Sequence, residues 1–106
     1  MFNALHEWGD PVRSAEHIRS ALAPNGTWMF TEPCTDEALV PSVRARTFYS
    51  ASTFVCTPSA LSQPGGEALG AQAGEAELRR VVEAAGFSRF RRATETPVFM
   101  VLEARP

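Results

Sequence analysis

Apolar residues recur at the spacing of an α-helix in three stretches of the chain. The clearest pattern covers Glu75–Ala85, where apolar residues from position 78 onward fall at i, i+3, i+4 and i+7. A second helix is predicted over about Pro11–Ala23, because the Asp10 side chain can accept free backbone N–H groups and proline suits the first helical position. A looser helical pattern covers Asp36–Thr57 and should stop at Pro58.

Runs of apolar, β-branched and aromatic residues predict strands between these helices. Phe2–Leu5 is typical of the end of a strand, and Thr27–Thr31 is typical of a central strand covered on both faces. Near the C-terminus, Phe87–Thr94 predicts a strand and Val98–Leu102 predicts a fully buried one. Because only Glu95–Pro97 separates them, these two strands should be antiparallel neighbours. The order of elements indicates an α/β fold in a single domain, residues 1–106.

Composition supports a small globular domain and narrows the class of partner. Of the 106 residues, 44% are apolar, and ten Lys and Arg against twelve Asp and Glu give a net charge of −2. Such a charge does not favour general binding to nucleic-acid phosphates or anionic lipid. The only basic cluster fits a solvated face better than a nucleic-acid site, because its neighbouring phenylalanines are better placed in the sheet. We therefore predict no nucleic-acid partner for this cluster, which comprises Arg79, Arg80, Arg89, Arg91 and Arg92.

The cysteines and the apolar stretches indicate neither a metal site nor a membrane protein. Cys34 and Cys56 lack the close Cys and His spacing of metal sites, even when His6 and His17 are included, so we predict reduced thiols and no metal. The first residues have no secretory signal pattern. The longest uncharged stretch, Thr47–Gly66, contains two prolines and many hydroxyl residues, which do not suit a membrane span. The expectation is a cytoplasmic protein.

Three passages resemble the second half of class I S-adenosylmethionine-dependent methyltransferases. They are the run from Ala4 to Pro11, the turn Leu22–Trp28 with its Ala-Pro-Asn-Gly sequence, and the closing helix and hairpin over 78–102. The resemblance covers nearly the whole chain, and the order and spacing of the passages are more specific than any one of them. It implies a partial Rossmann-like sheet with flanking helices, whose strands correspond to the fourth to seventh of the family, the last two being antiparallel.

The resemblance also implies S-adenosylmethionine as the cofactor, yet the Gly-rich loop that binds it in the family is absent from these 106 residues. Gln63–Gly74 contains four glycines, but they do not form a G-x-G-x-x-G sequence between a strand and a helix, so we predict a plain loop. Phe2 and Asn3 would lie beside the methionine part of the cofactor. We therefore expect the C-terminal half of a small-molecule methyltransferase, with an incomplete cofactor site and no activity on its own.

His6 is the main catalytic candidate. In plant-type small-molecule O-methyltransferases a histidine in a similar His-Asp-Trp-Ser-Asp passage is the base, and this sequence matches that passage at His6, Trp8 and Asp10. A hydroxyl attacks a sulfonium methyl group well only once its proton is leaving, and imidazole titrates near working pH. The alternative is that His6 only hydrogen-bonds a neighbour at a strand end, since a base also needs an orienting group and a substrate pocket.

The same resemblance implies residues that face the substrate. Trp8 would form a wall of the methyl-transfer pocket, although packing beneath the following helix accounts for it more simply. Glu32 comes at the carboxyl edge of a strand, where α/β folds place their sites, but we expect a solvated carboxylate. Phe48 and Tyr49 lie in the region that covers the substrate in this family and would suit an apolar or aromatic acceptor. Packing of a helix explains these two aromatic residues equally well.

A second class of function stays open beside the enzyme. An unpaired strand edge and an uncovered sheet face tend to recruit other chains. The chain would then be a non-catalytic interaction module that forms a homodimer or pairs with an N-terminal half.

Overall fold

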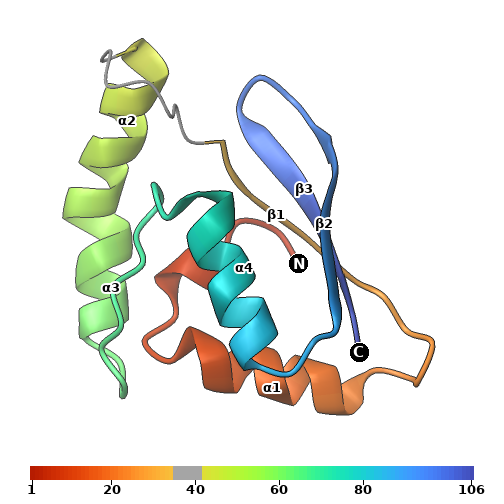
Figure 1. Ribbon diagram of the computed structural model, residues 1–106. Helices are drawn as coiled ribbons and strands as arrows, with labels where there is room; N and C mark the ends of the chain where they lie inside the picture. Colours follow the sequence, from red (N-terminus) through yellow and green to blue (C-terminus); the bar gives the residue numbers. More distant parts are fainter. Residues whose placement is uncertain (35–41) are drawn as a thin grey trace.

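The computed structural model describes residues 1–34 and 42–106, which form a three-stranded antiparallel sheet with helices packed around it (Figure 1). The elements in chain order are the 3-10 helix η1 (Leu5–Glu7), α1 (Pro11–Ala21), β1 (Trp28–Pro33), α2 (Val43–Ala51), the π-helix η2 (Ser52–Cys56), α3 (Thr57–Leu61), α4 (Gly74–Ala84), β2 (Arg89–Glu95) and β3 (Phe99–Arg105).

The strand order is β1-β3-β2, and β3 is antiparallel to both neighbours. The predicted antiparallel pairing of the last two strands is therefore confirmed. The middle strand of the sheet is β3. The prediction that Thr27–Thr31 forms a central strand is therefore wrong, because β1 lies at one end of the strand order. On the other side of β1, the described residues form only an isolated parallel bridge between Phe2 and Thr31, with Asn3 N–H donating to Thr31 O at 2.8 Å. The predicted strand over Phe2–Leu5 is thus reduced to this bridge, because the chain turns into η1 at Leu5.

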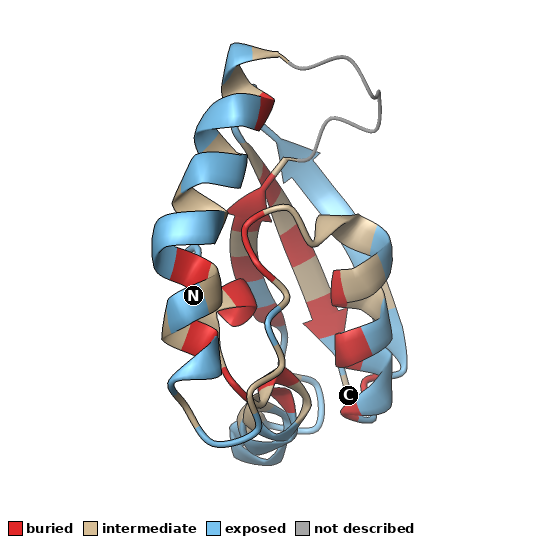
Figure 2. Ribbon diagram, turned by 90° about the vertical axis from the view of Figure 1, so that its left-hand side faces the viewer, coloured by how far each residue is buried: buried red, intermediate tan, exposed pale blue. Residues whose placement is uncertain are grey.

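Burial alternates along β1 and β3, so neither strand is buried on both faces as predicted (Figure 2). Met29 is 58% exposed, whereas its neighbours Trp28 and Phe30 are buried. The alternation follows from the helices, because α1 and α4 supply the apolar residues that cover one face. That face holds the core, which comprises Leu5, Ala15, Trp28, Phe30, Leu78, Val81, Val82, Ala85, Phe87, Met100, Leu102 and Ala104.

The start of α1 follows the prediction, and a glycine caps the end of α4. In α1, the Asp10 carboxylate accepts the backbone N–H of Arg13 at 2.9 Å and Pro11 occupies the first turn, although the helix ends two residues earlier than predicted. After α4, Gly86 has a φ of +86°, and the N–H of Phe87 donates to Val82 O at 3.3 Å. This is the left-handed cap that glycine favours.

The long helical arm beside η1 differs from its prediction. Residues 36–41 of the predicted Asp36–Thr57 helix lie outside the described residues, and from Val43 the helical path continues through α2, η2 and α3 to Leu61 (Figures 1 and 2). Pro58 does not stop it. The π-helical turns end directly before Pro58, with Thr57 N–H donating to Ser52 O, and this wider coil accommodates the proline ring without a break.

Gln63–Ala73 is an irregular loop, as predicted, and Gly74 already belongs to α4. Within residues 1–34 and 42–106, no helix has the length and apolar character that crossing a bilayer requires.

Candidate functional site

A histidine and a glutamate are paired in the interior between η1 and the end of β1. His6 and Glu32 are each 1% exposed, and His6 Nδ1 is hydrogen-bonded to Glu32 Oε2. The expectation of a solvated Glu32 is therefore wrong. Glu32 follows Trp28 and Phe30 at alternate positions of β1, so the pleat of the strand turns all three side chains to the covered face.

Glu32 also holds the backbone of the loop that carries His6. Its Oε1 accepts the N–H of Leu5 at 2.8 Å and the N–H of Ala4 at 3.2 Å. The first N–H groups of a helix have no partner within the helix, and Ala4 has no side chain that could cap η1. The Glu32 carboxylate, from a strand that is distant in sequence, thus caps η1 and also fixes the orientation of the His6 imidazole.

The second ring nitrogen of His6 faces Glu7 and Cys56. Nε2 is buried and has no hydrogen-bond partner among the described residues, and the closest carboxylate oxygen, Glu7 Oε1, lies 3.9 Å away. Burial raises the pKa of the Cys56 thiol to about 11, and a hydrogen bond to the Glu7 carboxylate adds to the shift. With Nδ1–H donating to Glu32, Nε2 carries a lone pair that can accept a proton.

Gln63 fastens this loop to the helical arm. Its Nε2 donates to Glu7 O at 2.9 Å and to Ser59 O at 3.1 Å, while its Oε1 accepts Gly9 N–H at 3.1 Å. Two backbone groups of the His6 loop and one of α3 therefore share a single amide side chain. The sequence offered no sign of this contact, because the partners are far apart along the chain.

The predicted substrate residues do not gather around His6. Trp8 is half-buried and packs against the core, beside a shallow depression on α1 that it lines with His17 and Ile18. Phe48 meets Phe99 edge to face, with 6.3 Å between ring centroids, and lines another depression beside the β2–β3 turn. Tyr49 is 62% exposed.

The predicted cofactor residues lie along β1. Phe2 is 78% exposed, and Asn3 has a φ of +50°, which asparagine tolerates better than most residues. Two glycines of the 63–74 loop stand where a side chain would collide: a Cβ on Gly65 would lie 2.5 Å from Gly9 O, and one on Gly70 would lie 2.3 Å from Ser52 Oγ. A Cβ on Gly66 would meet nothing within 4 Å. That the site for S-adenosylmethionine is incomplete within these residues stays a prediction.

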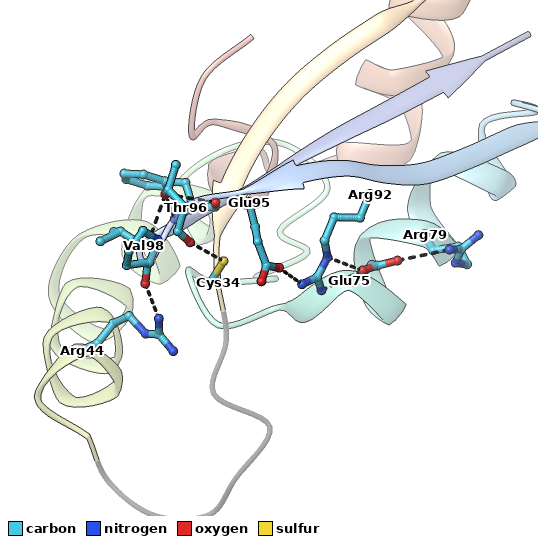
Figure 3. Close-up of polar contacts among 10 residues, drawn as sticks. Cys34, Arg44, Glu75, Arg79, Arg92, Glu95, Thr96 and Val98 are labelled. Carbon is cyan, nitrogen blue, oxygen red and sulfur yellow. Dashed lines mark hydrogen bonds and ion pairs between the residues drawn. The ribbon is translucent and has the colours of Figure 1, made fainter.

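Four of the five arginines in the basic cluster, all except Arg89, form ion pairs on the exposed side of α4 and β2, and Figure 3 shows those of Arg79 and Arg92. Glu75 bridges Arg79 and Arg92, with N–O distances of 3.2 Å and 2.7 Å, and Arg92 also pairs with Glu95. Arg80 and Arg91 are likewise paired with glutamates. The absence of a nucleic-acid partner stays a prediction, and this pairing supports it because neutralised arginines contribute less to phosphate binding.

Comparison with known proteins shows the fold and no closer relationship. No family model matches the sequence, and no curated protein matches it. A crystal structure described as a "putative O-methyltransferase" from Nostoc punctiforme PCC 73102 matches all of this chain, with a TM-score of 0.69 and 19% sequence identity. The match covers 30% of that longer protein. The chain therefore has a methyltransferase-like fold and spans less than a third of the length of the protein that it resembles.

Proposed function

We propose that this chain carries the base side of an S-adenosylmethionine-dependent O-methyltransferase site, with His6 removing the proton of a small-molecule hydroxyl. One observation supports the proposal above all others. In the buried His6–Glu32 pair the glutamate is the orienting group that a general base needs, and Nε2 of His6 has no hydrogen-bond partner among the described residues. The likeness to a methyltransferase-like fold supports the same class of reaction.

Each residue of the pair has a separate task in this proposal. Glu32 is a positioning residue, since its carboxylate keeps the Nδ1–H tautomer and the ring orientation. His6 is the catalytic residue, because its Nε2 would accept the hydroxyl proton of the acceptor. The cofactor supplies an electrophilic methyl group when bound, and its Gly-rich binding loop would come from outside these 106 residues.

The test is methyl transfer by a complete methyltransferase that carries the same histidine loop and the same glutamate at the end of the next strand. Replacing the histidine at the position of His6 by glutamine should lower kcat by roughly 10²–10⁴-fold, the usual contribution of a general base. Glutamine at the position of Glu32 should lower kcat, change its pH profile and leave the KM of the acceptor nearly unchanged. A histidine variant within a few-fold of the wild-type rate contradicts the base.

Calorimetry of the 106-residue chain with S-adenosylmethionine tests the second part of the proposal, that the cofactor-binding loop comes from outside these residues. No heat of binding is expected at micromolar concentrations, because these 106 residues contain no G-x-G-x-x-G sequence that could bind the cofactor. Clear micromolar binding would show that the cofactor site is complete within this chain.

The second candidate function is a non-catalytic interaction module. It is favoured by two exposed apolar side chains, Met29 on β1 and Phe2 beside that strand. Both are large apolar side chains next to an incompletely paired strand. Sedimentation separates the candidates: a tight, saturable dimer favours the module, and a monomer or polydisperse aggregate favours the methyltransferase part.

A further inference from the structure

Three side chains from two distant parts of the chain place potential metal ligands around one point. His6 Nε2, a carboxylate oxygen of Glu7 and Cys56 Sγ all lie within 4.8 Å of one another. We propose that these three residues bind a thiophilic divalent cation such as Zn²⁺. Residue spacing led to the opposite prediction of no metal, because the ligands come from η1 and from the last residue of η2 and have no recognisable spacing.

The unpartnered nitrogen is the observation that points to a ligand. A buried ring nitrogen without a hydrogen bond is unfavourable, and within residues 1–34 and 42–106 nothing bonds to Nε2 of the 1%-exposed His6. Its other nitrogen is held by the Glu32 carboxylate. A carboxylate on the far nitrogen is the usual outer partner of a zinc-bound histidine, since it fixes the tautomer and raises the basicity of the ligand.

The donor set and its spacing suit zinc. Thiolate, imidazole and carboxylate are the three ligand types that zinc prefers, and three protein ligands leave a fourth position for water or substrate. Tetrahedral ligands lie about 3.3–3.8 Å apart, so the present separations need side-chain movements of about 1 Å. The Glu7 side chain is 36% exposed, which gives an ion access from solvent.

The negative charge around the three ligand atoms favours a cation. The charged groups that act on the Cys56 thiol are Glu7 and Glu32, and both are negative. Binding would exchange the Cys56 thiol proton for the metal and release that proton to solvent. The π-helical coil of η2 presents Cys56 at its final residue, and such coils often occur at functional sites.

This inference goes beyond the proposed function and concerns a different state of the same histidine. A metal on Nε2 occupies the lone pair that the base would use, so Zn²⁺ should inhibit any methyl transfer that depends on His6. The two proposals fail separately, because metal binding is measured on the 106-residue chain without cofactor, acceptor or turnover.

The experiment is a Co²⁺ titration of the reduced chain, followed by optical absorption. We expect one equivalent of Co²⁺ to give intense visible bands of a four-coordinate ion and a near-ultraviolet thiolate charge-transfer band, and Zn²⁺ to displace both. Cys56→Ser should remove the charge-transfer band, while Cys34→Ser, at the other free cysteine, should retain it. His6→Gln should weaken binding by roughly 100-fold or more, and His17→Gln, on an exposed position of α1, should leave it unchanged.

Two results overturn the proposal. The first is the weak spectrum of six-coordinate Co²⁺ in the wild-type chain, and the second is equal loss of the charge-transfer band in the two cysteine variants, which would indicate adventitious binding. Glu7→Gln guards against a folding artefact, because Glu7 is partly exposed. This variant should keep the wild-type circular dichroism and bind Co²⁺ at least about tenfold more weakly, and unchanged affinity would remove Glu7 from the site.

Discussion

Glu32 connects three groups that would otherwise be buried without partners. Its two oxygens reach the His6 ring and the N–H groups of Ala4 and Leu5, and it is itself 1% exposed. A buried carboxylate without such partners would be strongly unfavourable, whereas a fully bonded one holds its neighbours in a single arrangement. The stability of η1 and the orientation of the ring therefore depend on the same side chain.

Replacing Glu32 should destabilise the fold in proportion to the partners that are lost. Glu32→Leu removes all of them and should lower the free energy of unfolding by about 3–5 kcal/mol, as expected for a broken buried pair. Glu32→Gln keeps an oxygen for the two N–H groups and should cost about 1–3 kcal/mol. Urea unfolding at neutral pH measures both. Glu16→Gln, on an exposed position of α1, is the control and should change stability by about 0.5 kcal/mol or less. A Glu32→Leu variant as stable as this control contradicts the account.

At the scale of single residues, part of the candidate site could be predicted from the sequence. His6 could be chosen from its loop, and the alternation of Trp28, Phe30 and Glu32 could have placed the glutamate on the covered face. The contact of Cys56 with Glu7 could not be predicted, because it depends on how the helical arm returns to η1. Neighbours of that kind follow from tertiary packing, on which residue spacing carries no information.

At the scale of elements, α4 shows how far a periodic pattern determines structure. Its buried residues Leu78, Val81 and Val82 are those that the helical spacing selects, and all three belong to the core. The helical arm shows the limit of the same reasoning, since Pro58 was expected to end a helix that continues through it. A change from α to π coiling alters the hydrogen-bond partners near the proline without any marked change in composition.

Leu78→Asp tests the buried stripe of α4. A carboxylate at this 1%-exposed position has no cation to pair with on the apolar face, so the free energy of unfolding should fall by on the order of 3 kcal/mol or more. Ala76→Asp is the matched control, because Ala76 is exposed on the same helix. Thermal unfolding followed by circular dichroism compares the two, and equal melting temperatures would mean that the stripe does not face the core.

At the scale of the whole molecule, the sheet is thin and covered unequally. The molecule measures 41 × 31 × 18 Å along its principal axes. Strand β2 is exposed at every position except the half-buried Phe90. The exposed edge is occupied by charged pairs, among them Arg91 with Glu103 and Arg92 with Glu95, while Arg80 pairs with Glu77 on the neighbouring helix α4. Paired charges on an edge strand hinder its pairing with other chains. The order of helices and strands was predictable from the pattern of the sequence, whereas the one-sided burial depends on which elements cover the sheet.

These pairs predict a loss of stability in acid. The hydrogen bond from Arg91 lowers the pKa of Glu103, and that from Arg80 lowers the pKa of Glu77. A carboxyl whose pKa is lower in the folded state contributes stability above its unfolded pKa, and this contribution disappears as the pH falls through the folded pKa. The melting temperature should therefore drop between about pH 5 and pH 3.

Glu103→Gln should make that acid-induced drop shallower, because the variant has no proton to take up at this position. Glu16→Gln, on an exposed position of α1, is the control and should follow the wild-type curve. Parallel curves for the wild type and Glu103→Gln would show that the Arg91 pair contributes nothing to folding.

The amide of Gln63 has a mechanical consequence. The same side chain bonds to the backbone of Glu7 and Gly9, just after His6, and to the backbone of Ser59 in α3. An outward movement of the arm would therefore either break these hydrogen bonds or move the His6 loop with it. Under the proposed function, entry of an acceptor past the arm would then be coupled to the position of the His6 ring.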